Sequence, residues 1–380
     1  MPYWRLSSFY FFYFAVLGIL VPYWGLFLQH RGFDAVVIGQ LMAVLMATKI
    51  VAPNILGWLG DHLGHRMVIV RAASLASVLV FGLMFVVHDF WAVAVAMALY
   101  SFFWNASLPQ FEVVTLNYLG DRTTRYARIR AWGSIGFIIA VMVLSVLVDR
   151  LGTAVVLPSV MAVFVSIWLT SLAVRDPDPQ PHPVVQQTSL GSLLHQPAVI
   201  AFFFAVMLMQ ASHGPYYTFY SIYMENHGYS NTLIGQFWAL GVLAEVAVFM
   251  VMHRLLEHFG AVRVLVASLT LAALRWLLIG YLPGSVVILL FAQLLHAATF
   301  GTFHGAAIDL VHRQFPGVLQ GRGQALYSSL SFGVGGAIGS LASGLVWDTL
   351  GPETSFLLAA LTALLGAWVT WRGLGGVARV

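Results

Sequence analysis

The chain consists of long, continuous runs of apolar residues separated by short polar stretches. A helix needs about 20 mostly apolar residues to cross a bilayer, and twelve runs of this kind can be marked. They cover residues 6–28, 36–59, 67–87, 89–111, 131–149, 153–173, 197–224, 232–252, 262–281, 284–307, 323–346 and 352–371. An outer-membrane barrel is excluded, because its strands alternate apolar and polar residues. The pattern predicts an all-α membrane protein with twelve transmembrane helices.

One connection differs from the short ones elsewhere. Residues 174–196 contain the segment RDPDPQPHP at 175–183. Proline at every second position cannot hold a helix and favours an extended, solvated chain. We therefore expect an N-terminal six-helix bundle over 1–173, a cytoplasmic linker over 174–196 and a C-terminal six-helix bundle over 197–380.

Composition narrows the class of protein further. Of the 380 residues, 60% are hydrophobic and 8% are charged, whereas a soluble domain carries about a quarter charged residues. This excludes a soluble globular protein, and the high hydrophobicity excludes a disordered chain. The absence of cysteine excludes disulfides, thiolate catalysis and cysteine-ligated metals.

The basic residues are distributed unevenly between the loops. With twelve spans and both termini on one side, thirteen arginines fall in the loops of that side and two, Arg31 and Arg150, in the loops of the other. The thirteen are Arg5, Arg66, Arg71, Arg122, Arg125, Arg128, Arg175, Arg254, Arg263, Arg313, Arg322, Arg372 and Arg379. The positive-inside rule then predicts that both termini lie in the cytoplasm. The net charge of +4 is explained by topology and gives no reason to expect a nucleic-acid partner.

The two halves of the sequence repeat one another. A shift of 196 residues places IGQ (38–40) on IGQ (234–236), LGDHLG (59–64) on LLEHFG (255–260) and Lys49 on Glu245. A shift of 199 places Gly136 on Gly335. Two parallel six-helix repeats are typical of transporters that bind substrate between the repeats.

The segment GWLGDHLGHR (57–66) resembles the loop 2–3 signature of the major facilitator superfamily. The glycines permit a tight turn at a helix end, and an aspartate can cap or pair with a neighbouring helix terminus. The resemblance implies a gating loop formed by Gly57, Asp61, Gly64 and Arg66. Histidines replace the basic residues that the superfamily usually has there.

A narrower resemblance lies in YARIRAWGS (126–134), with Glu112 eighteen residues before Arg130. It is similar to the proton symporters around lactose permease, in which residues at the positions of Arg130 and Glu112 form the substrate site. Over nearly its whole length the chain resembles the bacterial 3-phenylpropionic acid transporter branch. The segments QASHGPYY (210–217), GVLAEV (241–246) and LHAATF (295–300) carry that likeness.

Four charged residues lie inside apolar runs: Lys49, Glu112, Glu245 and Arg275. A charge at the centre of a bilayer helix costs about 2.5–3.5 kcal/mol on insertion scales. These side chains must therefore face a cavity or one another. Buried ion pairs that fix helix packing are one interpretation, and a substrate and proton site is the other.

Glu245, Arg275 and His296 fall on successive predicted helices. This layout resembles the proton-coupling region of lactose-permease-like symporters, where an acid beside an arginine exchanges its proton for an ion pair. Position 299 is Thr299, whereas the permease has a glutamate three residues after its histidine. The resemblance therefore favours Glu245 as the proton carrier, with His296 next.

Other side chains give weaker evidence for a binding site. His296 and His304 would lie about 80° apart on an α-helix, and no further ligand accompanies them, so we expect no metal and no cofactor. Aromatic residues crowd the first and seventh spans. Those we expect in contact with substrate are Tyr23, Trp24, Tyr216 and Tyr217, with interfacial belts as the alternative.

We expect a monomeric, proton-coupled transporter in a bacterial inner membrane, with the lipid bilayer, protons and a small organic solute as its partners. An aromatic carboxylate would bind Arg130 or Lys49. The alternative is a sugar or nucleoside symporter, in which Glu112 accepts hydroxyl protons. Drug efflux and a membrane-embedded sensor or enzyme are further alternatives. Against the last, the sequence shows no P-loop and no recognisable nucleophile arrangement.

Overall fold

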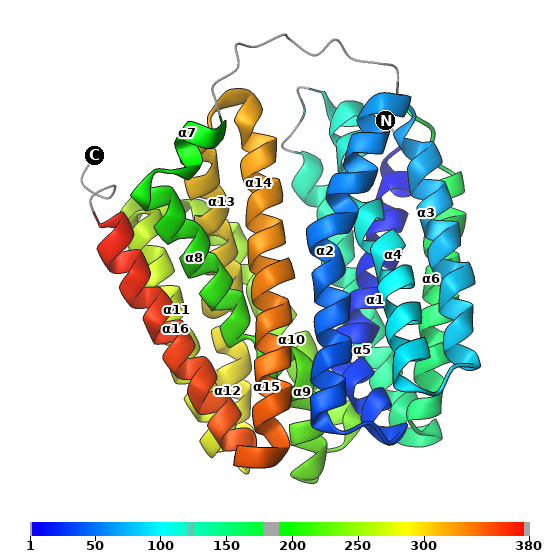
Figure 1. Cartoon of the computed structure of the whole chain (residues 1–380), viewed down its shortest axis with the longest axis vertical. Coiled ribbons are helices and arrows are strands. Elements are labelled where there is room, and N and C mark those ends of the chain that lie inside the picture. Colours follow the sequence, from blue (N-terminus) through cyan, green and yellow to red (C-terminus); the bar gives the residue numbers. More distant parts are fainter. Residues whose placement is uncertain (1, 121, 123–124, 178–189, 376–380) are drawn as a thin grey trace. The chain divides into compact units, whose positions relative to one another are not determined.

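The computed structural model describes residues 2–120, 122, 125–177 and 190–375. Within these ranges the chain is helical and contains no strand (Figure 1). Twelve stretches are long and apolar enough to cross a membrane. This confirms the all-α, twelve-span prediction.

Six spans come from the first half of the chain and six from the second. They are α1 (Tyr3–His30), α2 (Ala35–Leu63), α3 with η1 (Arg66–Phe81, Gly82–Phe85), α4 (Phe90–Leu119), α5 (Tyr126–Leu151), η3 with α6 (Thr153–Val155, Val156–Leu172), α8 with α9 (Pro197–Ser212, Gly214–Asn226), α10 (Asn231–Phe259), α11 (Ala261–Tyr281), α12 with η4 and α13 (Val286–His296, Ala297–Gly301, Thr302–Gln314), α14 with η6 and α15 (Gln320–Ser328, Ser329–Gly335, Gly336–Leu350), and α16 (Pro352–Leu374). Two short helices, α7 (Leu190–Leu194) and η5 (Gly317–Leu319), lie in connections.

The chain divides into two compact units. Unit 1 comprises residues 1–182 and 228–239, and unit 2 comprises 183–227 and 240–380. Helix α10 therefore contributes its first part to unit 1 and the rest to unit 2. Most of the expected linker, 178–189, lies outside the described residues, so its cytoplasmic location stays a prediction.

The start of α10 is held in unit 1 by polar contacts. The Asp149 carboxylate at the end of α5 accepts hydrogen bonds from the backbone N–H groups of Asn231 (2.8 Å) and Thr232 (2.7 Å). The Tyr23 hydroxyl donates to the Asn231 carbonyl oxygen at 3.3 Å. These bonds satisfy the first N–H groups of α10, which have no acceptor within their own helix.

Each unit contains a close helix crossing built on small residues. In unit 1, Gly18 and Gly136 bring the backbones of α1 and α5 together, because a β-carbon at either position would meet the backbone of the other helix. In unit 2, Gly214 and Gly335 do the same between α8–α9 and η6–α15. These glycines are related by the repeat shifts of 196 and 199 residues. The internal repeat thus corresponds to a shared helix crossing, of the kind small residues permit in membranes.

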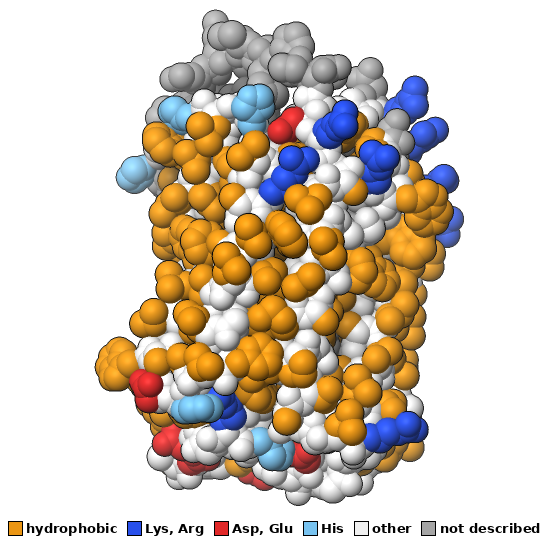
Figure 2. All heavy atoms as spheres, turned by 90° about the vertical axis from the view of Figure 1, so that its right-hand side faces the viewer, with side chains coloured by type: hydrophobic (Ala, Val, Ile, Leu, Met, Phe, Trp, Pro, Cys, Tyr) orange, Lys and Arg blue, Asp and Glu red, His pale blue; other side chains and the backbone are white. Residues whose placement is uncertain are grey.

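The surface agrees with a membrane environment. On the face drawn in Figure 2, hydrophobic side chains cover the middle, and most of the arginine and lysine side chains in view gather towards one end. Large apolar side chains on several helices are exposed, among them Leu79, Val143, Met250 and Leu345. Lipid tails are the solvent in which such side chains are stable.

Candidate functional site

A charged cluster lies in unit 1, between α4 and α5. The Glu112 carboxylate is 3.9 Å from the Arg130 Nε atom, and both side chains are 33% exposed. The Tyr126 hydroxyl donates a hydrogen bond of 2.9 Å to the same carboxylate. The structure therefore places together the two residues that the resemblance assigned to the substrate site, and it adds Tyr126 to them.

The Arg130 guanidinium lies against an aromatic ring. Its central carbon is 3.7 Å from the centroid of Phe14 on α1. Gly133 makes room for this arrangement, since a β-carbon there would lie 2.6 Å from the Phe14 ring and 2.9 Å from an Arg130 nitrogen. No residue in the described part of the chain accepts a hydrogen bond from Arg130. Its planar fork of donors is therefore oriented without being saturated.

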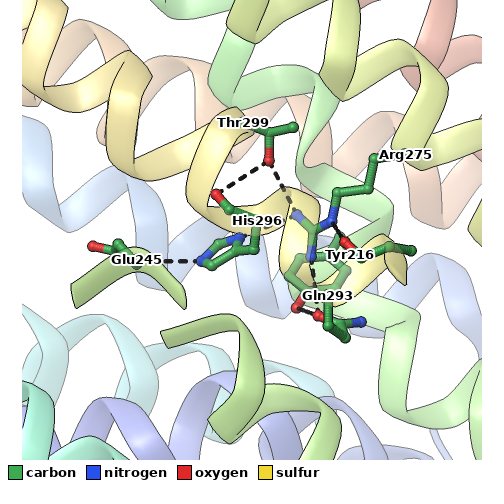
Figure 3. Close-up of polar contacts among 7 residues, drawn as sticks. Tyr216, Glu245, Arg275, Gln293, His296 and Thr299 are labelled. Atoms are coloured by element: carbon green, nitrogen blue, oxygen red, sulfur yellow. Dashed lines mark hydrogen bonds and ion pairs between the residues drawn. The ribbon is translucent and has the colours of Figure 1, made fainter. Parts of the chain in front are cut away.

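The second cluster lies in unit 2 and is built around a fully buried arginine, Arg275 on α11 (Figure 3). Its Nε donates to the Ala292 carbonyl (2.9 Å), and its two terminal nitrogens donate to His296 Nδ1 (3.1 Å) and to Gln293 Oε1 (3.2 Å). The guanidinium also lies 4.1 Å from the centroid of the Tyr216 ring. A buried cation is costly unless its donors are satisfied. Here neutral acceptors and an aromatic face satisfy them.

These contacts determine the protonation pattern of His296. A guanidinium has only donors, so the Nδ1 atom that faces it must be an acceptor. The neutral ring therefore carries its proton on Nε2, which faces the Glu245 carboxylate at 3.5 Å. A second proton on Nδ1 would set two donors against each other.

Further polar residues hold this cluster in place. The Tyr216 hydroxyl donates to Gln293 Oε1, and Gln293 Nε2 donates to the Tyr220 hydroxyl, both at 2.8 Å. Thr299 accepts a longer bond of 3.4 Å from Arg275. Gln293 and Tyr220 were absent from the sequence-based site, because a glutamine in an apolar run gives no signal of its partners.

A family model described as the MFS_1 like family matches residues 3–358. The chain belongs to this family. Membership makes it a membrane transporter of the major facilitator type, as the loop signature and the repeat predicted.

Two relatives and one solved structure illustrate the membership. The chain is 28% identical over 365 residues to the probable 3-phenylpropionic acid transporter of Escherichia coli, covering 93% of each chain. It is 23% identical over 367 residues to the maltose permease of Geobacillus stearothermophilus, covering 95% of this chain and 92% of the relative. A point mutant of the nucleoside transporter NupG matches with a TM-score of 0.86 at 18% identity, covering 97% of this chain and 99% of that one. The last comparison supports the MFS fold alone.

Two of the four residues expected in the gating loop, Gly57 and Asp61, lie in the last turns of α2, and Arg66 begins α3. Gly64 has a positive φ of 68° and ends the helix, a conformation that glycine adopts without strain. The Arg66 guanidinium pairs with the Asp61 carboxylate and donates to Gln110 Oε1 at 2.6 Å. A β-carbon at Gly57 would lie 3.5 Å from the Gln110 amide. Gln110 on α4 is thus the anchor of this loop, and the sequence alone did not indicate it.

The remaining predicted residues occupy varied surroundings. Lys49 is half-buried in the middle of α2. Trp24 is fully buried in unit 1, against Phe27 and Phe81. Tyr217 is half-buried and stacks on His213, with ring centroids 5.5 Å apart. Their contact with substrate stays a prediction. No group of three or more histidine, aspartate or glutamate side chains in the described ranges is placed to hold a metal ion.

Proposed function

We propose that this protein is a carrier, not an enzyme, and that it couples proton movement to the uptake of a small aromatic carboxylate similar to 3-phenylpropionate. The proposal rests on the surroundings of the Arg130 side chain. A guanidinium that lies on Phe14, is one-third exposed and has no hydrogen-bond acceptor among the described residues is suited to receive a carboxylate on two parallel bonds. The relation to the 3-phenylpropionic acid transporter supports the same substrate class.

Unit 2 supplies the group for the proton. Glu245 is 19% exposed, whereas the histidine beside it is 7% exposed and bonded to Arg275. Protonated Glu245 is neutral, and ionised Glu245 attracts the Nε2–H of His296. A change in the access of Glu245 to water would therefore change its proton occupancy, and substrate and proton would be held by different units.

Binding measurements on the purified protein test the anion site. A charge-assisted hydrogen bond contributes about 1.5–3 kcal/mol, so Arg130→Gln should weaken 3-phenylpropionate binding by about 10- to 100-fold. Arg130→Lys keeps the charge but loses the fork and should fall between wild type and Arg130→Gln. Glu112→Gln removes the competing carboxylate and should leave binding intact or improve it. Unchanged affinity in a folded Arg130→Gln variant would contradict the proposal.

A sugar or nucleoside substrate is the second candidate. The maltose permease relative and the partly exposed Glu112 carboxylate, which accepts one hydrogen bond from Tyr126, favour it. For such a substrate Glu112→Gln should weaken binding, because the carboxylate would accept hydroxyl protons. The sign of the effect of Glu112→Gln therefore separates an anion from a neutral solute.

We also propose an orientation in a bacterial inner membrane with both termini in the cytoplasm, from the thirteen-to-two distribution of loop arginines. Reporter fusions after Arg66 and within 177–190 should read cytoplasmic, and a fusion near Asp89 should read periplasmic. A periplasmic reading within 177–190 would contradict this orientation.

A further inference from the structure

Helix α5 carries a row of exposed apolar side chains on the side away from Arg130. Ile135, Ile139 and Val143 are 40%, 47% and 55% exposed, and we call these three residues the apolar stripe. They recur every four residues, so on an α-helix they lie within about 80° of one another. Arg128 falls on the same side, about 20° from Ile135, whereas Arg130 is turned about 160° from Arg128. The stripe and Arg128 therefore face away from the Arg130 side of α5.

Arg128 places a cation at the end of this stripe. It lies in the first turn of α5, and its side chain is exposed. In the described ranges the arginines that pair with a carboxylate are Arg66, Arg130 and Arg313, so Arg128 has no acid as a partner there. A cation is also unfavourable near the positive end of the helix dipole. An anion from outside the chain would satisfy both Arg128 and that helix end.

Two tryptophans lie between the apolar stripe and Arg128. Trp132 follows Arg128 by one helical turn, and Trp4 on α1 packs edge-to-face against it with ring centroids 5.4 Å apart. The Trp132 Nε1–H donates to the Tyr3 hydroxyl at 3.0 Å, which fixes the pair. Trp4 is nevertheless 68% exposed. Tryptophan is enriched at the level of the lipid headgroups, where its ring is apolar and its N–H is polar.

A second cation accompanies this pair. Arg5, next to Trp4, is exposed, and its contact with the Ala173 carbonyl at the end of α6 is a long one of 3.4 Å. Apolar side chains, tryptophan rings and guanidinium groups thus follow one another towards the ends of α1 and α5. A phospholipid presents its acyl chains, its glycerol region and its phosphate in the same order.

We propose that the first turns of α1 and α5 bind an anionic phospholipid. Its phosphate would contact Arg128, its glycerol region would lie on Trp4 and Trp132, and one acyl chain would follow the apolar stripe. A guanidinium can donate two parallel hydrogen bonds to a phosphate. The choline of phosphatidylcholine adds a positive charge and would oppose the arginines, so the site should prefer a lipid with net negative charge. This site lies within unit 1 and is independent of the solute that the protein carries.

Thermal unfolding of the full chain in detergent tests the site, because a ligand that binds the native state raises the unfolding midpoint. The titrants are dioctanoylphosphatidylglycerol, dioctanoylphosphatidylcholine and glycerol phosphate, which has no acyl chain. We expect wild type to prefer phosphatidylglycerol over phosphatidylcholine by about 10- to 30-fold, since each arginine contributes about fivefold. Glycerol phosphate should not raise the midpoint at the same concentrations.

Substitutions assign the preference to the two cations. Arg128→Gln should lower the preference for phosphatidylglycerol by about fivefold, and Arg128→Gln combined with Arg5→Gln should remove it. Arg128→Lys keeps the charge and should retain most of it. The ratio of the two lipid affinities is taken within each variant, so a change in intrinsic stability does not affect it. If Arg128→Gln does not fold, Arg5→Gln decides the outcome, with an expected loss of about fivefold.

Arg263→Gln is the matched control, because Arg263 is also exposed and is also the third residue of a spanning helix, α11. It should leave the preference unchanged. Equal losses in Arg263→Gln and Arg128→Gln would overturn the site in favour of a general attraction by net charge. Equal affinity of wild type for both lipids would also overturn it, and Trp4 and Trp132 would then belong to an ordinary interfacial belt. An equal response to glycerol phosphate would overturn it in favour of a phosphate site that needs no lipid.

Discussion

The two units each pair a carboxylate with an arginine, but they do so in opposite ways. In unit 1 the acid and the arginine face each other at 3.9 Å, and each is one-third exposed. In unit 2 the arginine is fully buried and donates to a histidine whose other nitrogen faces the acid. A guanidinium with unsaturated donors can bind an anion from outside. A buried guanidinium whose donors face neutral acceptors is not open to an anion, but it fixes the imidazole that contacts the acid.

We infer from this difference that the two units share a helical framework but have different functions. The glycine crossings of α1 with α5 and of α8–α9 with α15 are related by the repeat, so the frameworks are alike. The helices at the clusters differ, because the π turns η4 and η6 occur in unit 2. We propose that unit 1 binds the substrate anion and unit 2 binds the proton.

The largest effect is expected from removing the acid of unit 2. Glu245→Gln keeps the size of the side chain but cannot exchange a proton. It should abolish accumulation of labelled 3-phenylpropionate in proteoliposomes under a proton gradient, while counterflow exchange remains measurable. Glu112→Gln, the matched change in unit 1, should retain accumulation.

Protein-free liposomes are a required control, because an undissociated weak acid can cross lipid and collect on the alkaline side without a carrier. Accumulation by Glu245→Gln above that background would place the proton elsewhere, with His296 the next residue to change.

A large loss of stability is expected from Arg275→Met. The change leaves His296 Nδ1 without its donor and removes one hydrogen bond each from the Ala292 carbonyl and Gln293 Oε1, and a buried acceptor left unsatisfied costs about 1–3 kcal/mol. Arg130→Met removes a partly exposed partner and should cost about 1 kcal/mol or less. Thermal unfolding in detergent compares the two variants. Equal shifts in the unfolding midpoint would contradict the contrast between the buried cluster of unit 2 and the partly exposed cluster of unit 1.

The sequence was sufficient to predict the architecture. Bilayer thickness sets the length of an apolar run that can span a membrane, and twelve runs of that length are present. The repeat indicated that the two halves share a helical framework. The pairing of Glu112 with Arg130 and the succession Glu245, His296 and Arg275 came from the resemblance, and the structure brings both sets together.

The sequence was insufficient where tertiary packing decides. Phe14, Gln110 and Gln293 gave no signal, since an aromatic or an amide in an apolar run has many possible neighbours. The π turn at Ala297–Gly301 was also missed, because its residues do not differ from those of a regular span. It forms where a β-carbon at Gly301 would lie 2.9 Å from Val248 and 3.0 Å from Glu245, a close approach that no local pattern reveals.

Two glycine substitutions, one in each unit, are expected to have effects of intermediate size. Gly301→Ala should displace Glu245 from His296, lowering proton-driven accumulation several-fold while leaving substrate affinity nearly unchanged. Gly133→Ala should displace Arg130 from Phe14 and weaken binding of 3-phenylpropionate by about tenfold, since about one charge-assisted hydrogen bond is lost. Gly321→Ala is the control, because nothing lies within 4 Å of its added β-carbon. The same phenotype in both test variants would argue against a division of tasks between the units.

The smallest effect is expected from Tyr126→Phe, which tests how strongly the acid of unit 1 competes with the substrate. The Tyr126 hydroxyl holds one oxygen of Glu112 at 2.9 Å. Without that bond the carboxylate is free to turn towards Arg130, which it already approaches at 3.9 Å. A stronger internal ion pair leaves less of the guanidinium for an anion, so binding should weaken by about two- to fivefold, less than the full value of one hydrogen bond to a charged group.

Tyr13→Phe is the matched control for this change. The Tyr13 hydroxyl is buried in the same unit but donates to the Trp104 carbonyl, so its loss should leave anion binding unchanged. The double variant Tyr126→Phe with Glu112→Gln should bind as well as Glu112→Gln alone, because the competing carboxylate is then absent. Tighter binding by Tyr126→Phe would instead mean that the tyrosine, and not the acid, limits access of the anion to Arg130.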